Sequence, residues 1–271
     1  CTLYPLLRGV GESGERRAQR RHPRYPLPRL VASGPNQVWS WDITKLAGPV
    51  KWLYFSLYVL LDIFSRYVVG WLVAEREDGE LAGRLIAESC AKQGVAPGAL
   101  TVHSDRGSPM KAKPLVRLLA DLGVGRSLSR PRVSNDNPFS ESQFKTLKYH
   151  PEFPERFGSL QDTRSFLGDF FLRYNTMHHH SALGWLTPYD VHYGLAETRR
   201  AEREATLRRA FAATPERFLR GMPVPPALPQ VLPQHVRCKA AARRRLGAMW
   251  LMTWQASRVG RATSSMPFSW R

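Results

Sequence analysis

Three acidic side chains, Asp42, Asp105 and Glu141, lie in sequence settings that suit a site for divalent cations. Asp42 lies among aromatic and β-branched residues that favour a strand, and Asp105 follows an apolar run and precedes the turn residue Gly107. Glu141 lies just inside a helix that we expect to begin at Pro138. Three carboxylates held close together repel one another unless they share cations, and hard oxygen ligands suit Mg²⁺ or Mn²⁺. The sequence therefore predicts that these residues form a metal site.

A site of this kind would perform phosphoryl transfer. In-line attack on a phosphodiester builds negative charge on its non-bridging and leaving oxygens. Two cations about 3.5–4 Å apart can activate the attacking oxygen and stabilise the departing one. With Asp42, Asp105 and Glu141 as ligands of two Mg²⁺ or Mn²⁺ ions, no separate nucleophilic side chain is needed. By themselves, these residues indicate only a metal-dependent phosphoryl-transfer site.

The helix expected around Glu141 also presents two lysines. Glu141, Lys145 and Lys148 recur at i, i+4 and i+7 and so share one face. They could form a solvated ion pair worth roughly a few tenths of a kcal/mol. Because this face coincides with the acidic motif, we interpret both lysines as DNA phosphate contacts. Arg106 and Asn137, which can also cap the start of the helix, are further expected DNA contacts.

The composition favours a polyanionic partner. The formal net charge is +18, from 40 Lys and Arg against 22 Asp and Glu, which fits nucleic acid or an anionic membrane surface. No apolar run reaches the roughly 18 residues of a membrane-spanning helix. Three dispersed cysteines argue against a disulfide framework or a structural zinc site and fit a reducing cytosol. The start of the chain, without Met or a secretory pattern, is interpreted as an incomplete N-terminus.

The order of the expected elements indicates an α/β fold with a mixed sheet flanked by helices. The elements are strands at about 37–46, 52–61 and 66–74, a helix at 79–93, a strand at 100–104, a helix at 113–122, a strand at 124–128, and helices that begin near 138, 160 and 188. The short connection between the second and third strands predicts a hairpin. In this order, Asp42 falls within the first strand and Asp105 at the end of the fourth.

These motifs resemble those of the DDE transposases of bacterial insertion sequences, whose catalytic core is similar to that of retroviral integrases. The resemblance rests on Asp-Ile-Thr at Asp42, on His-Ser-Asp-Arg-Gly-Ser around Asp105, and on Glu141 after 35 intervening residues. It extends over about 34–194. It implies a ribonuclease H-like fold and a DNA transposase/integrase that acts as a homo-oligomer on DNA in the bacterial cytoplasm, associated with the nucleoid. Water would release a 3′-hydroxyl at an element end, and that hydroxyl would attack a target phosphate.

The resemblance decides the interpretation of two aspartates. Asp42 taken alone would be interpreted as a hydrogen-bonded structural acid, because Asp is unfavourable inside a strand. Its match to the first acid of the family reverses that interpretation. Asp62 is the competing acid in this region, and its place at a turn beside Ser65 indicates a backbone cap instead of a metal ligand.

Several histidines have roles that the sequence predicts only in part. The segment from Tyr174 resembles the family's Tyr-Asn-x-x-His-x-His-Ser motif, and we therefore expect His178 and His180 to contact DNA. His179 occupies the position that is commonly Arg, which weakens one phosphate contact. Consecutive histidines on a helix cannot all face one ion, so a metal site is not expected there. His103 could orient phosphate or an acid, and packing within its strand is an equally supported role.

We expect three parts along the chain. A basic arm at 1–33 is either a solvated linker or a segment that tracks phosphates. The integrase-like catalytic core occupies 34–194. A charged helix and a Pro-rich, basic tail follow at 195–271; this tail could be disordered, nucleic-acid-binding, or without a selected role. The alternatives to a transposase are a ribonuclease H-like nuclease that cuts without joining, and a catalytically inactive DNA-binding remnant.

Overall fold

A computed structural model describes residues 6–7, 9–11, 30–107, 109–131, 136–228 and 232–233. All the elements below lie in one compact unit, Cys1–Gln234, and the second unit, His235–Arg271, lies outside the described residues. Most of the predicted basic arm and most of the tail beyond residue 228 also lie outside them. The division of the chain at 33/34 and 194/195 therefore stays a prediction.

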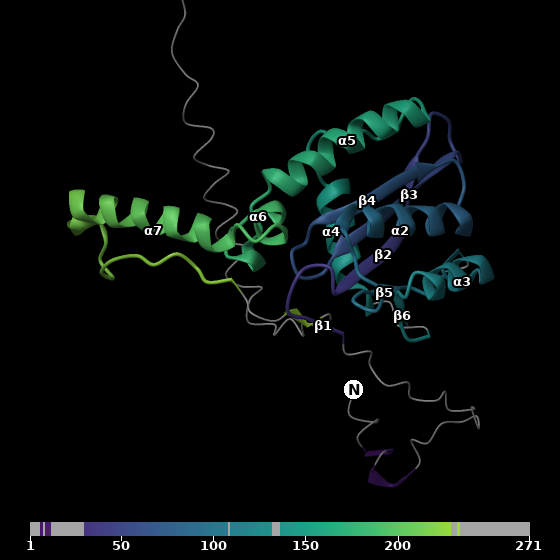
Figure 1. Ribbon diagram of the computed structural model, residues 1–271, viewed down its shortest axis with the longest axis horizontal. Helices are drawn as coiled ribbons and strands as arrows, with labels where there is room; N and C mark the ends of the chain where they lie inside the picture. Colours follow the sequence, from purple (N-terminus) through teal and green to yellow (C-terminus); the bar gives the residue numbers. More distant parts are fainter. Residues whose placement is uncertain are drawn as a thin grey trace, which may run out of the picture. The chain divides into compact units, whose positions relative to one another are not determined.

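A five-stranded sheet forms the centre of the fold (Figure 1). Its strands are β2 (Val38–Ala47), β3 (Tyr54–Asp62), β4 (Val68–Ala74), β5 (Thr101–Ser104) and β6 (Gly125–Leu128). They lie in the order β4-β3-β2-β5-β6; β3 is antiparallel to both β2 and β4, and β5 is parallel to both β2 and β6. The predicted mixed sheet and the predicted β3–β4 hairpin are confirmed. Three antiparallel strands followed by two parallel ones, with flanking helices, form the ribonuclease H-like arrangement that the motifs imply.

Strand β3 begins later than predicted, at Tyr54 instead of residue 52. The turn before it explains the difference, because the Gly48 N–H donates to the carbonyl oxygen of Leu53 (2.9 Å). Trp52 has a φ of 74°, which is incompatible with an extended strand. The aromatic and aliphatic residues of this turn have high strand propensity, so composition alone did not mark it.

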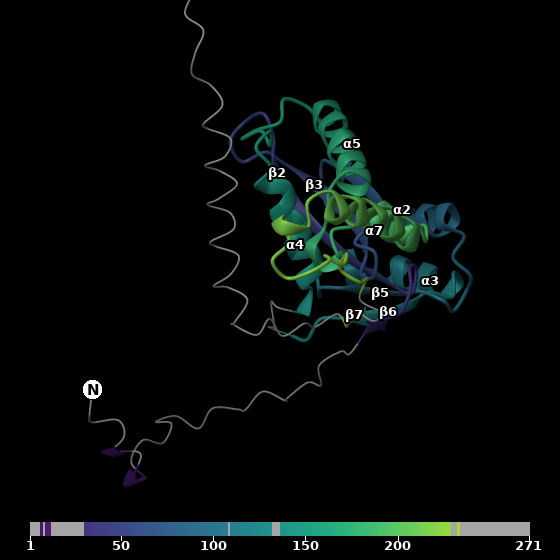
Figure 2. The ribbon, with the colours of Figure 1, turned by 90° about the vertical axis from the view of Figure 1, so that its left-hand side faces the viewer.

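Helices cover both faces of the sheet (Figures 1 and 2). They are α2 (Gly79–Gln93), α3 (Lys113–Asp121), α4 (Pro138–Lys148) and α5 (Leu160–Thr176). Tyr58 of β3 packs in a core with α2 and α3, whereas Leu57 and Val59 pack in a second core with α4 and α5. Because successive residues of a strand point to opposite faces, the two helix pairs lie on opposite sides of the sheet.

Capping residues set several helix ends where the sequence predicts them. The side chain of Asp78 accepts a hydrogen bond from the Glu80 N–H (2.9 Å) at the start of α2. Gly94 ends α2 in the left-handed conformation, with a φ of 62°. Ser159 Oγ accepts from the Asp162 N–H (3.0 Å) at the start of α5. These ends are local, so sequence signals were sufficient to place them.

Shorter elements and one charged helix complete the described part of the chain. They are β1 (Val31–Ala32), η1 (Pro109–Lys111), η3 (Ser181–Leu183), α6 (Pro188–His192), α7 (Ala196–Ala213), η4 (Pro215–Arg217) and β7 (Leu232–Pro233). β1 pairs with β7. The sequence did not predict this pairing, because a two-residue ladder leaves no side-chain pattern. No helix in the described ranges is long and apolar enough to cross a membrane.

Candidate active site

The sheet brings Asp42 and Asp105 to adjacent positions. β2 and β5 are parallel neighbours, and their last register pair joins Trp41 to Ser104. Asp42 follows Trp41 within β2, and Asp105 is the first residue after the end of β5. If the register continued by one residue, both side chains would lie on one side of the sheet, where neighbouring strands are about 4.8 Å apart. The fold therefore brings the backbone at Asp42 and at Asp105 to neighbouring positions at one edge of the β2–β5 pair.

Helix α4 places Glu141 on the same side of the sheet. Ser40, two residues before Asp42, is hydrogen-bonded to Ser140, the residue before Glu141. Ser40 and Asp42 share one face of β2 because side chains alternate along a strand. The start of α4 thus lies over the face of the sheet that carries Asp42.

The pKa of Asp42 depends on its burial and on the charged groups near it. Burial is the largest cause that raises the pKa of Asp42 to about 7, and the charges of Asp105 and Glu141 raise it further. The Ile43 N–H and the charge of Lys148 act in the opposite direction and lower this pKa. The structure therefore brings all three predicted acids within electrostatic range. The three carboxylates are not close enough to form a metal-binding group as they stand, because no three His, Cys, Asp or Glu side chains within the described ranges do so.

Two of the acids are held by one oxygen each. Asp42 Oδ1 accepts a hydrogen bond from the Ile43 N–H (2.8 Å), and Asp105 Oδ1 accepts one from Ser129 Oγ (2.5 Å). These bonds leave Oδ2 of each carboxylate for another partner. Carboxylate oxygens are the donors that Mg²⁺ and Mn²⁺ prefer, so the donor chemistry fits these cations. A shared cation would also offset the repulsion that raises the pKa of Asp42.

Lys148 is the predicted DNA-binding residue that lies beside the acids. Its Nζ donates a hydrogen bond to Thr44 Oγ1 (2.7 Å), and Thr44 lies on the same face of β2 as Asp42. Burial lowers the pKa of Lys148, and the charge of Asp42 acts in the opposite direction. Lys145, one turn earlier, is exposed. Arg106 is exposed, and its Nε donates to the carbonyl oxygen of Ser129 (2.7 Å).

Asn137 differs from its expected role. It precedes α4, but its side chain makes no capping hydrogen bond, so that part of the prediction is wrong. Its Oδ1 accepts from Ser40 Oγ (2.5 Å), and its Nδ2 donates to the carbonyl oxygen of Trp41 (3.3 Å). The residue is 0% exposed. A long-range hydrogen bond has replaced the local cap, and in this structure the side chain is not available to DNA.

The two predicted histidines lie beyond the end of α5 and differ in exposure. His178 is exposed, and its ring stacks on Tyr174 with 5.4 Å between ring centroids. His180 is partly buried. Burial is the largest cause that lowers its pKa to about 4, and Arg66 and His178 lower it further. At neutral pH, His180 is therefore uncharged and could meet a phosphate only through a hydrogen bond.

The competing acid, Asp62, has the structural role predicted for it. Its Oδ2 accepts from the Asn36 N–H (2.7 Å), and its Oδ1 accepts from both the N–H (2.7 Å) and the Oγ (2.8 Å) of Ser65. The residue is 0% exposed. Oδ1 thus caps the turn at Ser65, and Oδ2 joins this turn to the segment before β2, so the prediction of a backbone cap is confirmed.

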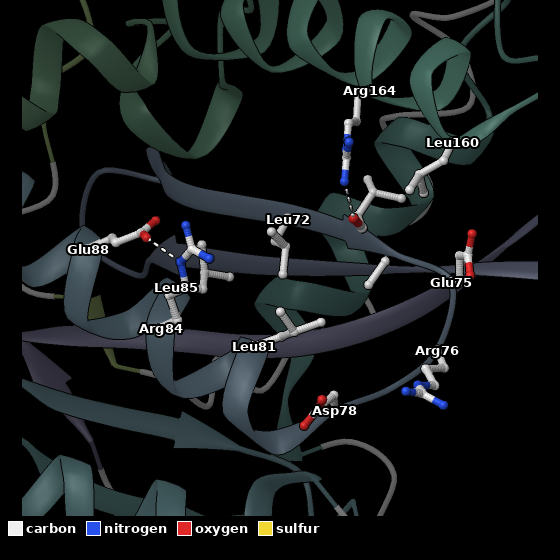
Figure 3. A pocket seen from close by; sticks show the side chains of 12 residues that line it. Leu72, Glu75, Arg76, Asp78, Leu81, Arg84, Leu85, Glu88, Leu160 and Arg164 are labelled. Carbon is white, nitrogen blue, oxygen red and sulfur yellow. Dashed lines mark hydrogen bonds and ion pairs between the residues drawn. The ribbon is translucent and has the colours of Figure 1, made fainter.

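A cavity of about 490 Å³ lies away from these residues, between β4, α2 and the start of α5 (Figure 3). Arg84 and Glu88 pair across part of its wall (2.7 Å), and Arg164 approaches the carbonyl oxygen of Val73 (3.5 Å). None of the predicted site residues lines it. Its volume therefore gives no support to a second catalytic centre.

Sequence reasoning missed the polar residues that hold the acids. Three buried serines do so. Ser129 donates a hydrogen bond to Asp105, and Ser40 and Ser140 are hydrogen-bonded to each other between the segments that carry Asp42 and Glu141. Strand alternation could have indicated Ser40, because it lies two residues before Asp42. Ser129 had no such signal, since it reaches Asp105 across 24 positions of the chain.

Comparisons with known proteins cover this core. An integrase core domain model matches residues 32–134, and a second integrase core domain model matches residues 122–188. The transposase for insertion sequence element IS904 of Lactococcus lactis is 33% identical over 197 residues, which are 68% of this chain and 76% of that protein. Transposase InsF for insertion sequence IS3A of Escherichia coli is 33% identical over 160 residues, which are 59% of this chain and 54% of that protein.

Two solved structures align with part of this chain. The simian T-cell lymphotropic virus intasome in complex with the PP2A regulatory subunit B56 gamma aligns with a TM-score of 0.49 and 20% identity, over 65% of this chain and 60% of that chain. The HTLV-2 integrase catalytic core domain in complex with magnesium aligns with a TM-score of 0.45 and 14% identity, over 59% of this chain and 97% of that chain.

Proposed function

Since the chain belongs to the insertion-sequence transposases with an integrase core domain, we propose that it cuts and joins DNA strands at a site made by Asp42, Asp105 and Glu141. Membership of this family is what the sequence motifs predicted. The chain covers 76% of one curated relative and 54% of another. The activity and the partners of the whole protein are therefore part of the proposal.

The observation that carries the proposal is that Asp42 and Asp105 directly follow Trp41 and Ser104, the last register pair of two neighbouring parallel strands. Both acids fall inside the first matched integrase core region, and Glu141 falls inside the second. Burial is the largest cause of the raised pKa of Asp42, and the further contributions of Asp105 and Glu141 support the same assignment. An acid whose neighbours are acids is costly to keep ionised unless a cation is shared.

We assign Asp42, Asp105 and Glu141 as the ligands of two divalent ions, Mg²⁺ or Mn²⁺. When bound, such ions would supply activation of the attacking oxygen and stabilisation of the leaving oxygen. Asp42 and Asp105 would each bind through Oδ2, since Oδ1 is held by the Ile43 N–H and by Ser129. Glu141 would complete the ligand set from α4.

Basic residues near these acids would orient the DNA. Lys148 reaches Thr44 beside Asp42, and Lys145 extends the same helix face toward solvent. Arg106 directly follows Asp105 and is exposed. Each of these cations can bind a phosphate and so hold the strand in register for in-line attack. His178 and His180 would add hydrogen bonds, whereas the buried Asn137 would act within the fold.

The proposed reaction has two steps at one site. Water would first cut a strand and leave a 3′-hydroxyl at an element end. That hydroxyl would then attack a target phosphate and join the two DNAs. Because two ends must meet one target, we propose that the chain acts as a homo-oligomer on DNA. The net charge of +18 supports DNA as the partner.

A strand-cleavage and joining assay tests this proposal. The full chain would be incubated with supercoiled plasmid, and with pre-cut duplexes that carry the terminal sequences flanking its own gene, in Mg²⁺ or Mn²⁺. We expect both nicking and joining, and we expect Asp105→Asn to abolish both while DNA binding persists. The matched control is Asp121→Asn, an exposed aspartate at the end of α3.

Each alternative gives a different result in the same assay. Cleavage without joining of pre-cut ends would indicate a nuclease. DNA binding without any Mg²⁺- or Mn²⁺-dependent cleavage would indicate an inactive remnant. Full activity in Asp105→Asn would contradict the assignment of the metal ligands.

A further inference from the structure

A buried group of serine and asparagine side chains joins the elements that carry the three acids. Ser40 Oγ lies 2.5 Å from Asn137 Oδ1 and 2.5 Å from Ser140 Oγ. Asn137 Nδ2 donates to the carbonyl oxygen of Trp41 (3.3 Å). All three polar residues are buried. These bonds connect the middle of β2 to the first turn of α4, across about 100 residues of chain.

The Ser40–Ser140 contact links the position of Glu141 to that of Asp42. Ser40 precedes Asp42 by two residues on the same face of β2, and Ser140 directly precedes Glu141. A shift at the Ser40–Ser140 contact would therefore move Glu141 relative to Asp42. The first turn of α4 is also held from another side, because the Arg66 guanidinium lies 3.6 Å from the centre of the Phe139 ring.

A second serine holds Asp105 directly. Ser129 Oγ donates to Asp105 Oδ1 (2.5 Å). Ser129 is fixed in turn, because its N–H donates to the carbonyl oxygen of Ser104 (3.0 Å) and its carbonyl oxygen accepts from Arg106 Nε (2.7 Å). It follows β6 immediately, so it extends the sheet beside β5. This serine orients one oxygen of the carboxylate and leaves the other oxygen free to turn toward Asp42.

The two serines are linked through the segment before α4. His103, two residues before Asp105, has its Nε2 3.1 Å from the carbonyl oxygen of Asp136 and 3.3 Å from Ser129 Oγ. The Asp136 carboxylate accepts two hydrogen bonds from the Arg130 guanidinium (2.9 and 3.0 Å). Asp136 is followed by Asn137, which binds Ser40. One hydrogen-bonded chain thus runs from Asp105 to the start of α4.

From this geometry we propose that Ser40 and Ser129 are positioning residues: they hold the segments that carry the three carboxylates, so that these side chains can close on divalent cations. The inference rests on the proposed function of Asp42, Asp105 and Glu141. A buried hydroxyl needs only one partner to be satisfied. The partners of these two serines are not arbitrary polar groups: Ser129 bonds to the candidate ligand Asp105, and Ser40 bonds to Ser140, the residue before the candidate ligand Glu141. Groups that hydrogen-bond to metal ligands typically change metal affinity or activity by about 10- to 100-fold when they are removed.

Direct measurement of Mn²⁺ binding tests the proposal. The full chain would be titrated with Mn²⁺ in the absence of DNA, and free Mn²⁺ would be followed by electron paramagnetic resonance. We expect Ser129→Ala and Ser40→Ala each to raise the Mn²⁺ dissociation constant about tenfold. The matched control is Ser56→Ala, a buried serine of β3 in the same sheet, which should bind Mn²⁺ as the wild type does.

The rate of DNA nicking provides the second readout. If the serines act by positioning, saturating Mn²⁺ should restore most of the nicking rate in Ser129→Ala and Ser40→Ala. A merely structural loss would lower the rate at every Mn²⁺ concentration and would contradict the proposal. Should Ser40→Ala fail to fold, Ser140→Ala replaces it, because alanine favours the helix. Ser140→Ala should raise the dissociation constant about threefold, since Ser40 keeps its bond to Asn137.

Asp105→Asn separates the failure of this inference from the failure of the proposed function. If Asp105→Asn loses Mn²⁺ binding while Ser129→Ala and Ser40→Ala bind normally, the serines are not positioning residues and the metal ligands stand. If Asp105→Asn itself binds Mn²⁺ as the wild type does, the proposed metal site is wrong.

Discussion

Two aspartates on neighbouring strands of one sheet have opposite surroundings. Asp62, at the end of β3, is enclosed by hydrogen-bond donors from Asn36 and Ser65. Asp42, in the middle of β2, has one backbone donor, and its nearest charged groups include Asp105 and Glu141. Burial raises the pKa of both acids, and both stay raised; at Asp62 the hydrogen bonds from Ser65 and Asn36 oppose the rise, whereas at Asp42 the charges of Asp105 and Glu141 add to it.

The difference teaches how to tell a structural acid from a candidate ligand. A carboxylate whose two oxygens both accept hydrogen bonds from the fold, as those of Asp62 do, stabilises the fold and is poorly placed to bind a cation. A carboxylate that is half-buried, repelled by other acids and bonded through one oxygen is destabilising until a cation arrives. Sequence propensity alone treats the two residues alike, because each is an aspartate at a strand.

The sharpest test of this contrast is Asp42→Asn. We expect strand cleavage to fall by at least about 10³-fold, because a ligand of the catalytic cations is lost. We expect the metal-free protein at pH 8 to become more stable by about 2 kcal/mol, since a carboxylate whose pKa is raised in the folded state opposes folding above its unfolded pKa. Urea unfolding in EDTA and a plasmid-nicking assay measure the two effects. Lower stability in this variant would contradict the contrast.

Asp62→Asn should give the reverse pattern. The asparagine keeps an acceptor oxygen for Ser65 but faces the Asn36 N–H with a second donor. We expect a loss of about 2 kcal/mol of unfolding free energy, because a buried donor is left unsatisfied. Nicking by the folded protein should stay within about threefold of wild type. Complete loss of chemistry in a folded Asp62→Asn protein would mean that the wrong acid was assigned to the metal.

The free energy of unfolding should also depend on pH through His192, which contacts Ser65 in the turn after β3. Its Nδ1 lies 2.9 Å from Ser65 Oγ, and burial lowers the pKa of His192 to about 4. The unfolded chain binds this proton near pH 6.5, so stability should fall as pH decreases from about 6.5 to 4 and be fully present above it. We expect His192→Gln to remove about 1–2 kcal/mol of that pH dependence. Urea unfolding at pH 7 and pH 5 measures it, and unchanged pH dependence would contradict the assignment.

The smallest expected effect concerns Lys145, on the exposed face of α4 beside the acidic region. Lys145→Ala should weaken DNA binding a few-fold and reduce the slope of log affinity against log salt by about 1, because one phosphate contact is lost. Fluorescence anisotropy with a labelled duplex over a range of NaCl measures both. The control is Lys92→Ala, an exposed lysine in the last turn of α2. Equal salt slopes for the two variants would remove Lys145 from the proposed DNA contacts.

The sequence was a reliable guide wherever the cause is local. Apolar patterns placed the strands of the sheet within two residues, and Asp78, Gly94 and Ser159 marked helix ends through bonds to nearby backbone. It was a poor guide at Asn137, where the residue type and Pro138 indicate a helix cap. There, hydrogen bonds to β2, about 100 positions away, replaced the capping bond. The turn at Trp52 and the β1–β7 pair were missed because neither has a distinctive local composition.

By itself, the sequence determined the family, the order of strands and helices, and the identity of three acids that could hold cations. The tertiary structure alone decided that β2 and β5 are parallel neighbours in a register that pairs Trp41 with Ser104, the residues just before Asp42 and Asp105. It also decided that Ser40 and Ser129 hold the segments around them. Periodicity and capping act over a few residues and can be read along the chain. Strand register and long-range hydrogen bonds depend on how distant segments pack, and no local pattern encodes them.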